Sequence, residues 1–124
     1  MITDWTIFWN RAGHSVVVEY VDNEMVITET PIVTNYYLSP GEKYGIGTEE
    51  SQIRYAMLED MLQSNSSFSM DDIRDALDSV SKHNFNSEFA STEWSIVYNQ
   101  STGEARYYHR ENYQKFYSFT AGSP

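Results

Sequence analysis

The sequence predicts an α+β domain in which an antiparallel sheet carries two helices on one face. Early in the chain, alternating apolar and polar residues predict three short strands joined by tight turns. Apolar residues at helical spacing follow in the middle, and a second alternating stretch near the C-terminus predicts a β-hairpin. Strands and helices that come in separate runs are typical of a two-layer α+β arrangement.

Length, charge and cysteine content limit the possible classes of protein. At 124 residues, the chain is long enough for a core of its own, so we expect residues 1–124 to form a single domain. The net charge of −10 argues against a nucleic-acid partner, because phosphate backbones favour clustered Lys and Arg. The absence of cysteine excludes disulfides and a cysteine nucleophile carried by this chain. With no membrane span or signal-peptide pattern, we expect a cytoplasmic protein without a membrane partner.

The first part of the chain predicts a three-stranded antiparallel meander. The expected strands are Thr3–Asn10, Ser15–Val21 and Met25–Thr30. Ser15–Val21 is a nearly continuous β-branched run, which is the pattern of a strand buried on both faces. A turn at Gly13 and a tight connection at residues 22–24 join the strands. Residues 32–35 then add a short extended piece that runs into a glycine-rich loop.

Two helices are expected after this loop. Thr48 can cap the first helix, and Ser69 with Asp72 forms a capping box for the second. The apolar stripe of the first helix comprises Ile53, Met57, Leu58, Met61 and Leu62. The stripe of the second comprises Ile73, Ala76, Leu77 and Val80. Each stripe indicates a helix that buries one side.

Acidic and histidine side chains leave metal binding open as an alternative. The acidic residues of the second helix are Asp71, Asp72, Asp75 and Asp78. A calcium loop would also need a glycine and a terminal glutamate, which are missing, so a solvated helix face is favoured. The histidines are His14, His83 and His109. Their spacing predicts no convergence, so surface positions are favoured over metal ligands or catalytic bases, and we expect no metal or cofactor.

The predicted hairpin lies at Trp94–His109, with turn chemistry in NQSTGE. Its two strands have aromatic and β-branched residues on both faces, which is more than a solvated ribbon needs. We therefore expect its outward face to be buried against another copy or a partner. An aromatic segment at Tyr113–Phe119 predicts one more strand or a short helix.

The order of four motifs resembles that of a known family. The motifs are SVVVEY in a predicted strand, VTN after the meander, SxxR at the start of a helix and WSIVYN in the hairpin. In this order and spacing they resemble the C-terminal part of the linear amide C–N hydrolases, the choloylglycine hydrolase and penicillin V acylase group. The resemblance covers nearly the whole chain, but only the last part of a typical family member.

The resemblance implies a fold and two supporting residues. The family belongs to the N-terminal nucleophile hydrolases, so the expected fold is part of an αββα sandwich, and a processed nucleophile, usually cysteine, attacks an amide carbonyl. Asn35 matches the asparagine that helps to hold the oxyanion, and Arg54 matches the arginine that orients the nucleophile region. The residues alone also allow a structural role for each: Asn35 suits the start of a turn, and Arg54 could form an ion pair with Glu50 one helical turn earlier.

Two hypotheses follow, from different functional classes. In the first, the chain is the C-terminal fragment of a bile-salt hydrolase-like or penicillin acylase-like amide hydrolase, inactive until a complementing N-terminal fragment supplies the nucleophile. In the second, it is a non-catalytic module that forms a homodimer, because a sheet with apolar residues on both faces would otherwise expose one of these faces to solvent.

Overall fold

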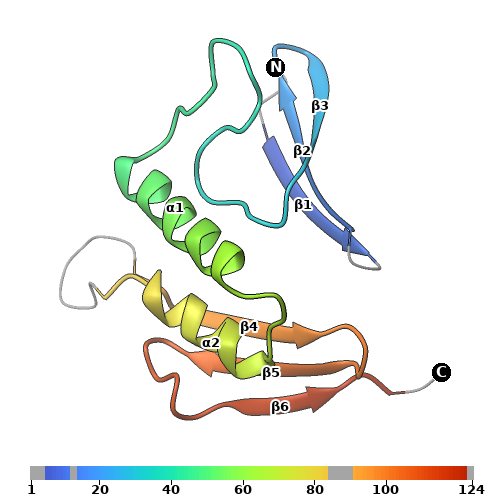
Figure 1. Cartoon of the computed structure of the whole chain (residues 1–124), viewed down its shortest axis with the longest axis vertical. Helices are drawn as coiled ribbons and strands as arrows, with labels where there is room; N and C mark the ends of the chain where they lie inside the picture. The colour runs from blue at the N-terminus through green and yellow to red at the C-terminus, as the bar shows by residue number, and fades with distance from the viewer. Residues whose placement is uncertain (1–4, 12–13, 84–90, 123–124) are drawn as a thin grey trace. The chain divides into compact units, whose positions relative to one another are not determined.

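The chain folds into two helices and six strands in the order β1-β2-β3-α1-α2-β4-β5-β6 (Figure 1). The structure is a computed structural model that describes residues 5–11, 14–83 and 91–122. The mixture of helices with antiparallel sheets confirms the predicted α+β class.

The strands form two three-stranded sheets, whereas one sheet was expected. Both helices separate β3 from β4 along the chain, and each sheet pairs only strands that are neighbours in sequence. Short turns favour such local pairing, because closing a short loop costs little chain entropy. The chain divides into two compact units, residues 1–60 and 61–124, so each sheet belongs to its own unit. The single-domain organisation stays a prediction.

The N-terminal sheet is the predicted meander, with order β1-β2-β3. Its strands are β1 (Trp5–Arg11), β2 (His14–Val21) and β3 (Glu24–Glu29). Asp22 and Asn23 connect β2 to β3 with φ angles of 51° and 64°, the left-handed conformations that a two-residue hairpin turn requires. The predicted turn at Gly13 lies outside the described residues. Buried and half-buried residues alternate along β2, so only one of its faces is fully covered.

Helix α1 (Glu49–Ser64) begins as predicted but does not bury its apolar stripe. The backbone N–H of Ser51 donates to Thr48 Oγ1 at 3.2 Å, which confirms the expected cap. Ile53 and Met57 are 53% and 40% exposed, whereas the fully buried side chain of this helix is that of Ser51. The prediction that the stripe packs into a core is therefore wrong for these two residues.

Helix α2 (Met70–Ser79) has the predicted capping box. Ser69 Oγ accepts a hydrogen bond from the Asp72 backbone N–H at 3.1 Å, and Asp72 Oδ2 accepts one from the Ser69 N–H at 2.7 Å. The hydrogen bond from the Ser69 backbone, followed by that from its hydroxyl, lowers the pKa of Asp72. The carboxylate is therefore ionised and holds the first turn of the helix at neutral pH.

The C-terminal sheet contains the predicted hairpin and has the order β4-β5-β6. Its strands are β4 (Trp94–Asn99), β5 (Glu104–His109) and β6 (Tyr117–Thr120). The C-terminal aromatic segment thus contributes a strand rather than a helix. Asn99 Oδ1 accepts hydrogen bonds from the backbone N–H groups of Ser101 and Thr102, and Gly103 takes a φ of 74° in the hairpin turn.

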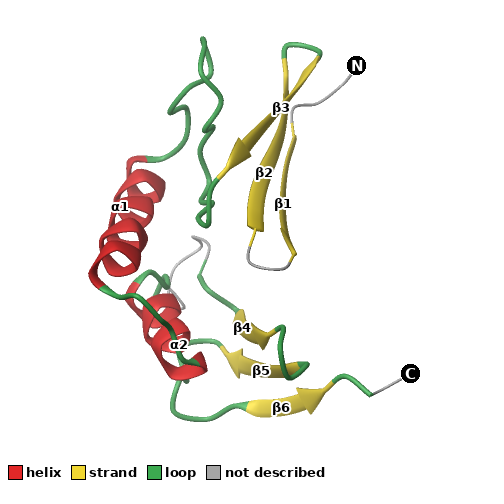
Figure 2. Ribbon diagram, turned by 45° about the vertical axis from the view of Figure 1, so that its right-hand side comes forward, coloured by secondary structure: helices red, strands yellow, loops and turns green. Residues whose placement is uncertain are grey.

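Helix α2 packs on one side of this sheet, as Figure 2 shows. The buried centre consists of Val97, Tyr108 and Tyr113. The helix covers it with Met70, Ile73 and Leu77. Ile73 and Leu77 belong to the stripe predicted for this helix, which is confirmed at these positions. A core of this kind stabilises the sheet by removing apolar area from water.

Candidate functional site

The segment that follows β3 is held to the N-terminal sheet by a buried carboxylate. Glu19 lies on the central strand β2 and is fully buried. Its Oε1 accepts a hydrogen bond from the Leu38 N–H at 2.9 Å, and its Oε2 accepts bonds from the N–H, at 2.7 Å, and the hydroxyl of Ser39. Because an unpaired buried carboxylate would be very costly, these three donors explain how β2 tolerates an acid.

Asn35 lies at the centre of a tight turn within this segment. The Tyr36 N–H donates to the Thr34 carbonyl at 2.9 Å, which closes a three-residue turn around Asn35. The Asn35 residue is exposed. A bridge between Tyr36 and Gly47 places the glycine against the Asn35 carbonyl and the Tyr36 side chain, so closely that a Cβ on Gly47 would overlap both. The residues alone placed Asn35 at the start of a turn, whereas the structure places it at the centre of one, and the residue is exposed to solvent.

Arg54 is held by the first turn of α1. Its Nη2 donates to Ser51 Oγ at 3.1 Å, and its Nε donates to the Glu50 carbonyl at 3.3 Å. The Ser51 hydroxyl also lies 2.7 Å from Thr48 Oγ1. The guanidinium is thus fixed to the helix N-terminus by a buried serine.

Ser51 connects the Arg54 side chain to the turn around Asn35. The Thr34 hydroxyl donates to the Ser51 carbonyl at 2.8 Å, and Thr34 directly precedes Asn35. The two residues singled out in the sequence therefore belong to one hydrogen-bonded assembly in the N-terminal unit. Sequence reasoning missed Thr34 and Ser51 as links, although both stand inside the VTN and SxxR motifs.

A pair of tyrosines lies next to the Asn35 turn. The rings of Tyr36 and Tyr55 meet edge to face with centroids 5.4 Å apart, and the Tyr55 hydroxyl lies 3.4 Å from Thr30 Oγ1. Partial burial, and then the neighbouring Tyr55, raise the pKa of the Tyr36 phenol. Both effects keep the Tyr36 phenol neutral.

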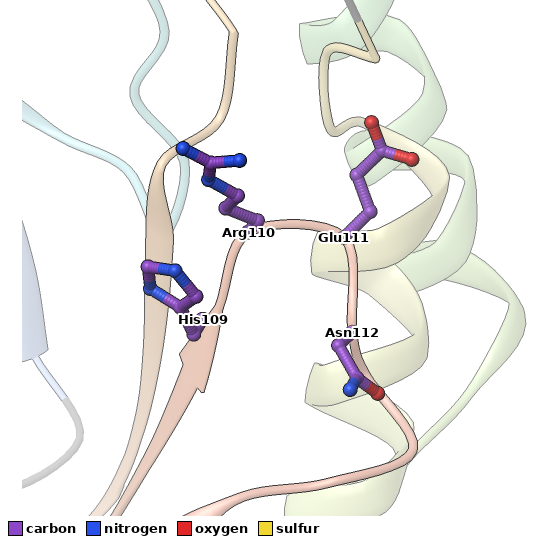
Figure 3. Close-up of a pocket in the computed structure, with 4 residues that line it drawn as sticks. All are labelled: His109, Arg110, Glu111 and Asn112. Carbon is purple, nitrogen blue, oxygen red and sulfur yellow. The ribbon is translucent and has the colours of Figure 1, made fainter. Parts of the chain in front are cut away.

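A second candidate location is an open hollow at the turn between β5 and β6, drawn in Figure 3. It is lined by His109, Arg110, Glu111 and Asn112. Glu111 Oε2 pairs with His83 Nδ1 at 3.0 Å, and Arg110 Nε lies 3.4 Å from Glu93 Oε2. All four of these partners are more than a third exposed, so each pair contributes little. The contacts at the hollow are therefore surface pairs.

The acidic face of α2 is paired with arginines. Asp71 Oδ1 lies 3.2 Å from both Arg74 Nη1 and Arg106 Nη1, and Asp75 Oδ1 lies 2.8 Å from Arg74 Nη2. No group of three or more His, Asp or Glu side chains within the described ranges is placed to hold a metal ion. The ion pairs of Asp71 and Asp75, with the capping box of Asp72, give three of the four acidic residues a structural role.

Comparisons with protein-family models, with curated proteins and with solved structures find no match to this chain. No helix in the part of the chain that the structure describes is long and apolar enough to cross a membrane. The resemblance to linear amide hydrolases therefore rests on the sequence motifs alone.

Proposed function

We propose that this chain supplies the oxyanion-binding part of a hydrolase of linear amides, and that a nucleophile outside these 124 residues completes the enzyme. The observation that supports this proposal is the assembly in which the Thr34 hydroxyl and the Arg54 guanidinium both bond to Ser51. Both bonds meet at Ser51, so one buried residue supports the Asn35 turn and Arg54 together, and a preorganised site depends on supports of this kind.

The proposed reaction assigns a separate task to each residue. A thiolate on a complementing fragment adds to the amide carbonyl, and the Asn35 side-chain amide donates a hydrogen bond to the oxygen as it gains negative charge. The α-amino group of the same N-terminal cysteine, which took the thiol proton, gives that proton to the amine as the C–N bond breaks. It then takes a proton from the water that hydrolyses the acyl-enzyme, so the acid and the thiolate are released. Arg54 acts as a positioning residue through its bond to Ser51.

The proposal is tested by mixing the chain with the cysteine-bearing N-terminal fragment of a bile-salt hydrolase or penicillin V acylase. Release of amine from a bile-salt conjugate or from penicillin V is measured. Asn35→Ala is expected to lower kcat by about 10²–10³-fold with little change in KM, the usual loss for one oxyanion donor. The matched control is Asn65→Ala, which removes an exposed amide at the end of α1 and should leave turnover unchanged.

Two outcomes would contradict the proposal. One is a stable complex without turnover. The other is turnover that Asn35→Ala does not reduce.

A further inference from the structure

The C-terminal sheet has an apolar face on the side opposite α2. Strand register places eight residues together there, because side chains alternate between faces along each strand. This outer face consists of Trp94, Ile96, Tyr98, Ala105, Tyr107, His109, Tyr117 and Phe119. Ser95 and Val97, which alternate with the first three, are buried on the side that α2 covers.

The outer face is large enough for a stable protein interface. Its five most exposed large side chains are between 48% and 62% exposed. Since an aromatic side chain buries roughly 150–250 Å², these five present about 500–600 Å² to solvent. This area is near the lower end of specific interfaces, which bury roughly 600–1,000 Å² per partner. An apolar surface of this size on one protein marks an interaction site.

The charge of the chain indicates what covers this face. The outer face contains no Asp, Glu, Lys or Arg, although the chain has a net charge of −10. Residues 61–124 hold eight acidic and five basic residues, which gives this unit a net charge of −3. Charge repulsion between two copies is therefore weaker for the unit that carries the outer face than for residues 1–60. Apart from His109, and the Lys115 ammonium 5.5 Å from the Tyr117 ring, the face offers little charge for a charged partner to recognise, so it fits a surface that is likewise apolar.

We propose that the outer face is the contact between two copies of this chain, which stack their C-terminal sheets face to face. A two-fold axis presents the same surface from both partners, so a neutral aromatic face is complementary to itself. In the dimer, the two sheets lie between two copies of α2, and the outer faces form a shared core about 10 Å thick. The inference does not rest on amide hydrolysis.

The test is the mass of the full chain in solution, measured by sedimentation equilibrium over a range of micromolar concentrations. The expected result is a reversible shift from the 14.4 kDa chain to twice that mass. Ile96→Lys places a charge on the outer face halfway along the edge strand β4 and should weaken the dimer by at least about 100-fold, because a desolvated, unpaired charge is costly.

A matched control separates the outer face from general surface apolarity. Ile27→Lys makes the same chemical change at a strand residue of the N-terminal sheet that is 58% exposed, and it should leave the dimer intact. If Ile96→Lys fails to fold by circular dichroism, Phe119→Lys at the other edge of the outer face replaces it. A wild-type monomer at high micromolar concentration would overturn the proposal, as would a dimer that Ile27→Lys disrupts and the outer-face variants do not.

Discussion

Replacing Glu19 by glutamine should destabilise the N-terminal unit strongly, although the two side chains have nearly the same shape. The carboxylate accepts three hydrogen bonds from Leu38 and Ser39, and neither of its oxygens donates. Glutamine would direct an NH₂ group at one of these donors, which leaves a buried N–H unpaired at a cost of about 1–3 kcal/mol. The remaining bonds also lose their charge assistance. We expect the free energy of unfolding to fall by about 3 kcal/mol, after allowing for the easier desolvation of a neutral amide.

Urea unfolding followed by tryptophan fluorescence measures this change, because two of the three tryptophans, Trp5 and Trp9, lie on β1 beside β2. With a slope of about 1–1.5 kcal/mol per M urea, a loss of about 3 kcal/mol lowers the midpoint by roughly 2–3 M. The control is Glu29→Gln, whose carboxylate is 76% exposed and pairs with His14, and it should change stability by no more than about 0.5 kcal/mol. Equal midpoints for the two variants would refute the anchoring role of Glu19.

Three further outcomes are expected. Gly47→Ala should lower the free energy of unfolding by about 1–3 kcal/mol, because the new Cβ overlaps the Asn35 carbonyl and the Tyr36 side chain. An unchanged midpoint in urea unfolding would contradict this close contact. The pKa of Asp72 is lowered in the folded chain, so this carboxylate stabilises the fold above its ordinary pKa of 3.8, and the stabilisation is lost as the pH falls through the pKa of the folded state. Asp72→Asn should therefore make the helical circular dichroism signal fall less steeply as the pH is lowered into the acid range. Identical acid titration curves for the wild type and the variant would argue against the capping box. The buried hydroxyl of Tyr108 has no hydrogen-bond partner among the described residues, so Tyr108→Phe should leave the thermal midpoint unchanged or raise it, and a clear fall would reveal a partner.

The local features of the fold are those that the sequence predicts well. The capping box of Ser69 and Asp72, the cap at Thr48 and the hairpin turn after Asn99 each involve residues only a few positions apart. Patterns of this kind carry their own geometry, because the hydrogen bonds close within one turn of chain. The α+β class follows from them.

Features that depend on distant partners were not predicted. The repeating pattern of β2 indicates a strand, but it does not show that Glu19 meets donors 20 residues later. The sequence also does not reveal that Gly47 must approach the backbone at Asn35, or that the strands separate into two sheets. The roles that the motifs suggest for Asn35 and Arg54 stay predictions, and the buried Ser51 that bonds to Arg54 and to Thr34 is visible only in the folded chain.

The two tethers of the segment after β3 also bear on the order of folding. Glu19 and Ser39 are 20 residues apart, and Thr34 and Ser51 are 17 apart, so both connections close within the N-terminal unit. Loops of this length form quickly compared with distant strand pairings. Beyond these tethers, the turn around Asn35 is held by the single bridge between Tyr36 and Gly47, which is much less than the full ladder of β2. Its amide hydrogens should consequently exchange with solvent earlier than those of β2.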